Sequence, residues 1–136
     1  MTTNTDATIY NLVQTQGGDV RAFRHYIPAV HWYGRPSVRA DAAGTAESSA
    51  FSIRIPDPAG YVPPRVWRSM TDAERRACWT VQPDDVVVKG SAETEIFDED
   101  GHRLEDLPAF YDEVCTIRFA HDNTGTNVPH IYAGGV

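Results

Sequence analysis

Proline and glycine occur along the entire chain, and their distribution most limits the folds open to it. Nine prolines and ten glycines divide the 136 residues into uninterrupted stretches of only about 5 to 9 residues. Long helices need more room, because proline breaks a helix and glycine weakens one. We therefore predict an all-β fold. The expected form is a small barrel or sandwich of roughly eight short strands, with a long proline-rich loop and one or two short helices.

The length predicts a single domain over residues 1–136, because domains commonly contain about 100 to 150 residues. Hydrophobic residues make up 41% and charged residues 23% of the chain, an ordinary balance for a folded protein. Residues 1–7 are small and polar, and we expect them to be flexible. The sequence has neither a basic start followed by an apolar run nor about 20 consecutive apolar residues. We expect synthesis in the cytoplasm and no membrane contact.

Several stretches carry strand patterns. The first is 8–13, and residues 20–33 read as two strand halves separated by Pro28, which cannot donate to a sheet ladder. "SVRADA" (37–42) and "FSIRIP" (51–56) alternate cleanly, and we expect them to form a hairpin. Together these patterns favour antiparallel pairing of neighbouring strands.

The strand signal from Asp85 to Lys89 is the strongest in the sequence. Val86 and Val88 point to one face and Val87 to the other, so both faces are β-branched. Such a strand suits burial between a barrel core and a second layer or a neighbouring subunit. A central strand of an isolated domain is the alternative.

Residues 56–78 form the longest stretch without a strand pattern. Four prolines among its first nine residues favour an extended, polyproline-like arm. Thr71 or Asp72 is expected to cap a short helical turn in its second half. The closing segment, 128–136, forms either a last strand or a tail that reaches a neighbour.

Aromatic anchors on a pre-ordered segment suit a protein interface, because little entropy is lost on docking. Packing of the same rings in the core or rim of the domain is the alternative. The candidate interface residues from the two segments are Tyr61, Pro63, Pro64, Trp67, His130, Ile131 and Tyr132.

Metal and cofactor motifs are missing from the sequence. None of the five histidines has HExxH spacing, and Cys78 and Cys115 are far apart, which predicts reduced thiols rather than a zinc site. "DEDG" (98–101) fails as a calcium loop, because the first and twelfth positions would be Ile96 and Leu107. Nucleotide-binding glycine motifs are also missing from the sequence. We expect no metal and no cofactor.

Catalytic patterns are equally sparse. The sequence contains no GxSxG elbow, and paired acids such as Glu93 and Glu95 could support glycoside hydrolysis only if a cleft brought them together. Acidic residues on exposed strands and turns are far commoner than catalytic dyads. We therefore predict that the protein is not an enzyme.

The net charge of −7 argues against binding to phosphate backbones, which depends on Lys and Arg. An acidic protein can nevertheless line a route for DNA, because like charges keep the polymer off the wall. Asp98, Glu99 and Asp100 are candidate residues for such a lumen, with a solvated outer turn as the alternative.

An ordered set of motifs from Thr8 to Val136 resembles small virion proteins of tailed bacteriophages that are encoded among the head-tail joining genes. The motifs are "TIYN", "VHWYG", "FSIRIP", "YVPPRVW", "WTVQPDDVVVKG", "AETEI", "LEDLPAFYDEVCTIRF" and "HIYAGGV". The resemblance is to the head-closure, or stopper, class.

This resemblance implies a structural role in the virion neck between head and tail. Six or twelve copies would form a ring that contacts the portal and adaptor proteins on one side and tail terminator or tail tube proteins on the other. DNA would pass through the channel without specific binding. The alternatives are a tail terminator, a minor capsid or decoration protein, and a small β-barrel hydrolase or ligand-binding protein.

Overall fold

The computed structural model describes residues 2–34, 38–40, 46–48 and 50–136, with only the backbone described for 38–40 and 46–48. The elements in chain order are β1 (Thr5–Gln14), β2 (Val20–Gly34), β3 (Val38–Ala40), β4 (Ala46–Ser48), β5 (Phe51–Ile55), α1 (Pro64–Arg68), α2 (Asp72–Ala77), β6 (Val86–Lys89), the 3₁₀ helix η1 (Leu104–Ala109), β7 (Val114–Asp122) and β8 (Ile131–Gly135).

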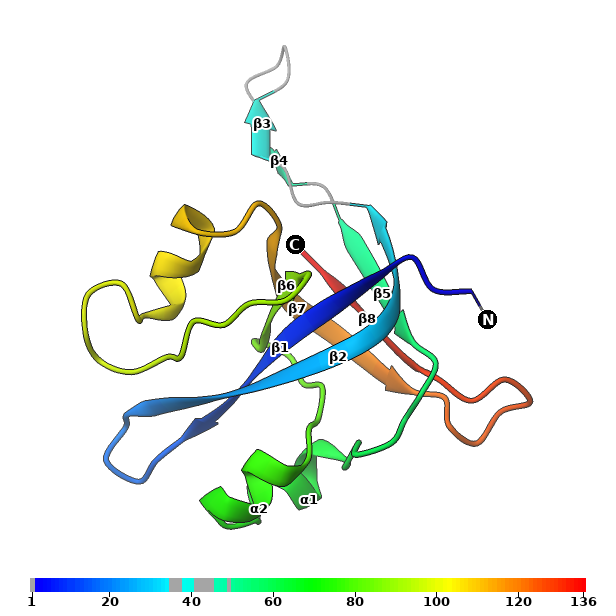
Figure 1. Ribbon diagram of the computed structural model, residues 1–136, viewed down its shortest axis with the longest axis horizontal. Coiled ribbons are helices and arrows are strands. Elements are labelled where there is room, and N and C mark those ends of the chain that lie inside the picture. Colours follow the sequence, from blue (N-terminus) through cyan, green and yellow to red (C-terminus); the bar gives the residue numbers. More distant parts are fainter. Residues whose placement is uncertain (1, 35–37, 41–45, 49) are drawn as a thin grey trace.

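Six antiparallel strands form a closed barrel in the order β1-β2-β5-β8-β7-β6 (Figure 1). The prediction of a mainly β barrel is thereby confirmed. The barrel has six strands rather than about eight, because β3 and β4 pair with each other in a separate two-stranded sheet. Among the described residues, no helix is both long and apolar enough to cross a bilayer.

The expected hairpin between 37–42 and 51–56 is not formed. β3 pairs with β4, whereas β5 pairs with β2 on one side and β8 on the other. Alternation alone identified "FSIRI" as a strand but could not identify its partners, because neighbours in a barrel need not be neighbours in sequence. The segment 128–136 supplies β8, the strand between β5 and β7.

β1 begins at Thr5, inside the stretch 1–7 that was expected to be flexible. Asn4 already bonds to β2: its side chain donates to the Trp32 carbonyl over 2.9 Å and accepts from the Trp32 amide over 2.8 Å. The Asn4 side chain thus makes the pair of hydrogen bonds that a backbone residue of β1 would make, and it extends the ladder between β1 and β2 by one step.

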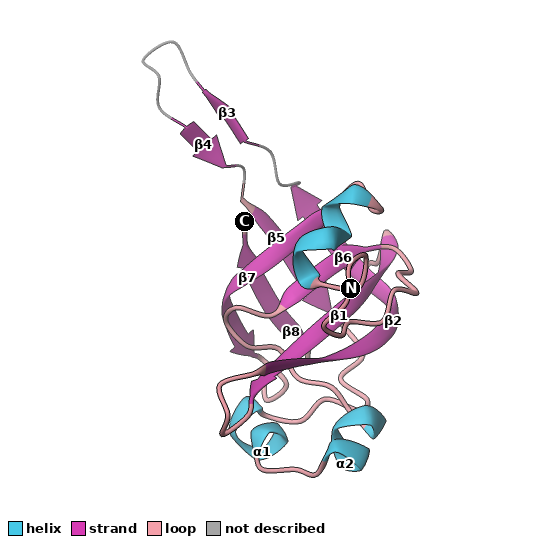
Figure 2. Ribbon diagram, turned by 90° about the vertical axis from the view of Figure 1, so that its left-hand side faces the viewer, coloured by secondary structure: helices cyan, strands magenta, loops and turns pink. Residues whose placement is uncertain are grey.

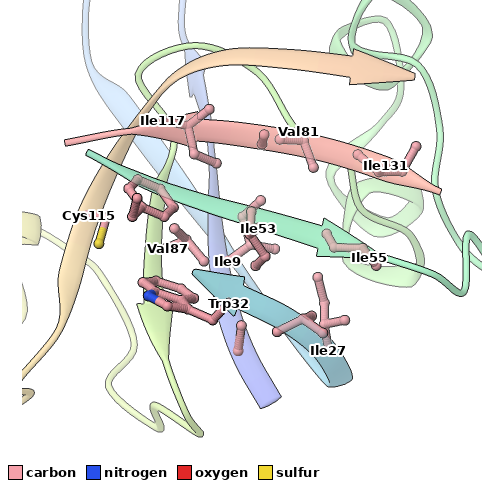
Figure 3. Close-up of a cluster of buried hydrophobic side chains, with 14 of the residues drawn as sticks. Ile9, Ile27, Trp32, Ile53, Ile55, Val81, Val87, Cys115, Ile117 and Ile131 are labelled. Atoms are coloured by element: carbon pink, nitrogen blue, oxygen red, sulfur yellow. The ribbon is translucent and has the colours of Figure 1, made fainter. Parts of the chain in front are cut away.

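Alternate side chains of the six strands fill the barrel, as Figure 3 shows. Trp32 and Phe51 stack with ring centroids 5.0 Å apart, and isoleucines from β1, β2, β5, β7 and β8 pack around them. The barrel is therefore a packed core and not a pore.

The proline-rich segment 56–78 lies against one end of this barrel. Its residue Tyr61 pairs with Trp79, and α1 and α2 follow beneath the barrel in Figure 1. Thr71 is the N-cap of α2, with a reciprocal capping box to Glu74. The prolines shape a cover for the barrel end, with Pro64 as the first residue of α1.

β6 is buried on both faces by this chain itself. Val87 points into the barrel core, while Val88 packs outside it with Tyr10, Ala92 and Leu107. Tyr10 belongs to β1, whereas Ala92 and Leu107 come from the segment that leaves β6, crosses the outside of the sheet and ends in η1. Residues 92–97 have no regular secondary structure there. The second layer that the valines required is thus intramolecular.

Candidate functional site: interaction surfaces

Two of the candidate interface residues are used inside the subunit. The Trp67 side chain is 0% exposed and packs edge-on against Phe23, with ring centroids 5.6 Å apart. Tyr61 is half-buried and meets Trp79 edge-on at 5.3 Å, and burial raises the pKa of its hydroxyl. Beside them, Pro63 is exposed and Pro64 half-buried. In this segment the aromatic rings belong to the core and rim of the barrel.

The C-terminal candidates divide between core, loop and surface. Ile131 is buried in the barrel. His130 is half-buried, and its ring nitrogens lie 2.7 Å from the Val128 carbonyl and 3.2 Å from the Asn123 side-chain nitrogen. Tyr132 faces outward from β8. Of the three, Tyr132 is the residue placed to contact a partner.

Tyr132 belongs to an aromatic patch on the outer side of the β5-β8-β7 sheet. Its ring lies 5.1 Å from the Arg54 guanidinium, 5.6 Å from the Phe119 ring and 6.3 Å from the His121 ring. Tyr33 is 73% exposed and stands on the next strand, β2, opposite Ser52 of β5. We call these five residues, Tyr33, Arg54, Phe119, His121 and Tyr132, the aromatic face. The mixture of aromatic rings with arginine is typical of interfaces.

The acidic turn lies outside the barrel. Asp98 and Asp100 are almost fully exposed, and Arg103 bonds to both, over 3.2 Å and 2.6 Å. Glu99 is exposed beside them. The structure therefore places all three acids on an outer turn of the monomer, where ion pairing with Arg103 holds the turn together.

A groove of about 900 Å³ runs beside the start of β2. It is lined by residues 19–24, by Arg76 of α2, and by residues 95–98 with Arg103 and Leu104 from the opposite wall. We call it the β2 groove. Glu95, one of the acids considered for catalysis, is engaged here: it accepts from Arg24 Nε and Nη2 over 2.9 Å and 2.7 Å. Sequence reasoning missed this groove, because its walls come from three separate segments.

A buried polar network joins β1 to the segment before β6. The Asp85 side chain is 0% exposed and accepts from the Leu12 amide, the Asn11 side chain, and both the amide and side chain of Gln82, over 2.8 to 3.1 Å. Burial raises the pKa of Asp85 to about 7, against the opposing effect of these donors. Arg68 Nη1 donates to the side-chain oxygen of Gln82 over 2.9 Å.

This network was also missed, because "QPDD" reads as an ordinary turn. Asp85 has a perturbed pKa, yet each of its contacts is with the protein's own groups, and it does not line the β2 groove. We assign it to the stability of the barrel end. Within the described ranges, no three His, Cys, Asp or Glu residues are grouped so as to hold a metal ion.

The β3–β4 hairpin projects from the end of the barrel where β2 finishes and β5 begins. Figure 2 shows it standing clear of the strands and helices, with α1 and α2 at the opposite end. Its two strands pair over Val38–Ala40 and Ala46–Ser48. We call it the projecting hairpin.

These features define a small closed antiparallel barrel. Its candidate functional features are surfaces: the aromatic face, the β2 groove and the projecting hairpin. The chain belongs to a family of unknown function (DUF6751), whose model matches residues 1–136. No curated protein matches the sequence. No solved structure matches the chain either.

Proposed function

We propose that this protein is a structural subunit of a tailed-bacteriophage virion, a head-closure ring component that joins the portal and adaptor to the tail. The order of the sequence motifs suggests this class. The observation that carries the proposal is the projecting hairpin. An isolated two-stranded hairpin is marginally stable in water, so one that leaves its own barrel needs a second surface to pack on.

The filled barrel leaves no room for DNA inside a single subunit. Its interior is occupied by Ile, Val, Trp and Phe side chains, so DNA passes through the centre of a ring of copies and not through a barrel. The net charge of −7 suits subunits around that route, because it disfavours adhesion of DNA. Each copy then needs two different contact surfaces, as closed rings do.

The aromatic face is the second surface that supports the proposal. Tyr33 lies at the root of the projecting hairpin, because β2 leads into the hairpin, and the face continues from there across β5 to Arg54 and Tyr132. We assign this face to the contact with the axial neighbours, the adaptor above or the tail below. The aromatic rings supply contact area there at a small cost in side-chain entropy.

Image reconstruction of the neck of particles that contain this protein tests the proposal. A ring next to the portal adaptor is expected. Copies at the end of the tail tube would instead identify a tail terminator, and copies on the capsid facets a decoration protein. Absence from virions would overturn the structural role altogether.

A genetic test uses the projecting hairpin. Replacing residues 36–48 with a short glycine-serine turn keeps the six barrel strands, and we expect a folded protein that no longer enters particles. Deleting residues 58–69 would be a poor test, because it removes the buried Trp67 from the barrel end. Normal tailed particles from the hairpin variant would contradict the proposal.

A further inference from the structure

The first half of β2 has an open edge. Thr15 donates to the Asp19 carbonyl over 2.7 Å, and pairing along the β1–β2 ladder alternates from there. The odd-numbered residues of this stretch therefore bond to β1, and the backbone groups of Val20, Ala22 and Arg24 point away from it. In the described part of the chain, no strand pairs with this side of residues 20–24, and no other backbone hydrogen bond reaches these outward groups.

β5 does not cover this edge, because it pairs with β2 only at His31–Gly34. The β2 groove is what lies along the edge instead. Its lining includes Val20 and Ala22 from one face of the strand and Arg21 and Phe23 from the other, and a groove that touches both faces must run past the edge between them. Unpaired strand groups of this kind recruit another strand.

The projecting hairpin also has unpaired strand edges. Both of its strands pair only with each other, so each keeps one open edge of its own. We infer that the projecting hairpin of one copy adds as a strand to the open edge of β2 in the next copy and is seated in the β2 groove. This inference rests on the proposed function and names the contact that closes its ring.

The hairpin cannot fill the groove of its own subunit. It leaves β2 after Gly34, whereas the groove begins at the other end of that strand, roughly 40 Å away at about 3.3 Å per residue. Figures 1 and 2 show the hairpin pointing away from α2, which forms one groove wall. A contact between two different surfaces of identical copies is heterologous, and repeated heterologous contacts give closed rings or filaments.

The groove walls suit an entering backbone with small side chains. Phe97 and Val20 are 46% and 58% exposed there, and they offer apolar surface on either side of the edge. Arg76 stands on the α2 wall over the Phe23 ring, 5.8 Å from its centroid. Main-chain hydrogen bonds supply the affinity of such strand addition, and wall contacts fix its register.

A mixing experiment tests the contact directly. One protein carries Val20→Lys and Ala22→Pro, which block the groove and remove an outward N–H without removing a bond to β1. The other has residues 36–48 replaced by a short turn. Each is expected to be monomeric by light scattering, whereas their mixture forms a one-to-one complex, because one intact hairpin and one intact groove remain. The absence of that complex would overturn the inference.

Val20→Lys has a matched control in Val66→Lys, on an exposed position of α1 outside the groove. We expect Val20→Lys to weaken self-association at least about tenfold and Val66→Lys by less than about twofold. Both side chains are exposed, so the two variants should fold alike. Equal effects of the two substitutions would count against the groove.

Hydrogen exchange on the unaltered protein gives a test without substitutions. The amides of Val20, Ala22 and Arg24 should exchange fast in dilute monomer and at least about tenfold slower after assembly, while those of Arg21 and Phe23 are protected in both states. Fast exchange at the three outward amides, in assembled protein or at every concentration, overturns the inference. A neck ring with these amides unprotected would leave the proposed function standing. If the mixing experiment succeeds but the protein is absent from the neck, the strand-addition contact stands and the proposed function falls.

Discussion

The Asn11 side chain donates a hydrogen bond to Asp85 Oδ2 over 2.8 Å, across 74 positions of sequence. The same amide donates to the Thr80 carbonyl over 2.6 Å, and its oxygen accepts from the Thr80 amide over 3.1 Å. Asn11 therefore acts as a short strand partner for the segment before β6. One buried side chain anchors both Thr80 and Asp85 to β1.

Asn11→Ala should destabilise the barrel by about 3 kcal/mol, because it leaves the buried amide and carbonyl of Thr80 without a partner and removes one of the donors to Asp85. Urea denaturation followed by tryptophan fluorescence measures this loss. Asn123→Ala is the control: Asn123 is half-buried in a loop beside His130, and its loss should cost less than about 1 kcal/mol. Equal losses would show that the buried network does not stabilise the fold.

The pH dependence of stability should reflect Asp85. Its pKa is about 7 in the folded protein and near 3.8 when unfolded, so between these values the folded state holds a proton that the unfolded chain releases. The free energy of unfolding should therefore fall as the pH rises from about 4 to about 7, by up to about 4 kcal/mol for this group alone.

Urea titrations at several pH values between 4 and 8 check that dependence. Asp85→Asn serves as the control, since it removes the titrating group, and its curve should be flatter than that of the unaltered protein across the window. Burial also lowers the pKa of His25, which acts in the opposite direction in both proteins and so cancels in the comparison. Parallel curves would rule out a raised Asp85 pKa.

The sequence predicted the barrel because its strand signals are local. β-branched runs such as 86–89 and alternation in "FSIRI" report how each residue meets a pleated surface. The same signals contain no information about which strand lies next in the barrel. β5 and β8 pair across 75 residues of intervening chain, and the 37–42 stretch was therefore assigned the wrong partner.

The aromatic residues show a second limit of sequence reasoning. Trp67 and Tyr132 looked alike as candidate anchors, yet the first is 0% exposed and the second lies on an outer face. Their difference is decided by Phe23, which is distant in sequence and covers Trp67. Composition identifies large amphipathic rings, but only the packing decides which of them stay available to a partner.

Closure of the barrel depends on Gly135. A Cβ at this position would lie 2.0 Å from the Thr116 carbonyl oxygen and 2.8 Å from the Arg118 amide, both backbone atoms of β7. Gly135→Ala should therefore force β7 and β8 apart and cost at least about 3 kcal/mol, or prevent folding. Gly125→Ala, in a loop with nothing within 4 Å of its Cβ, should change stability by less than about 0.5 kcal/mol. Comparison of the two melting temperatures, with soluble yield as a second readout, checks the prediction, and an intact Gly135→Ala barrel would contradict it.

The two thiols should differ sharply in reactivity. Cys115 is buried in the barrel, and burial raises its pKa to about 12, which leaves about one thiolate in ten thousand at pH 8. Cys78 is half-exposed at the end of α2, where its thiol lies 3.2 Å from the Glu74 carbonyl and burial raises its pKa more moderately. A disulfide reagent such as dithionitrobenzoate should therefore modify Cys78 slowly in native protein and Cys115 only on unfolding.

Cys78→Ser should abolish the native reaction while denaturant still reveals one thiol. Rapid modification of both thiols in native protein would mean that the barrel opens far more readily than its packed core implies.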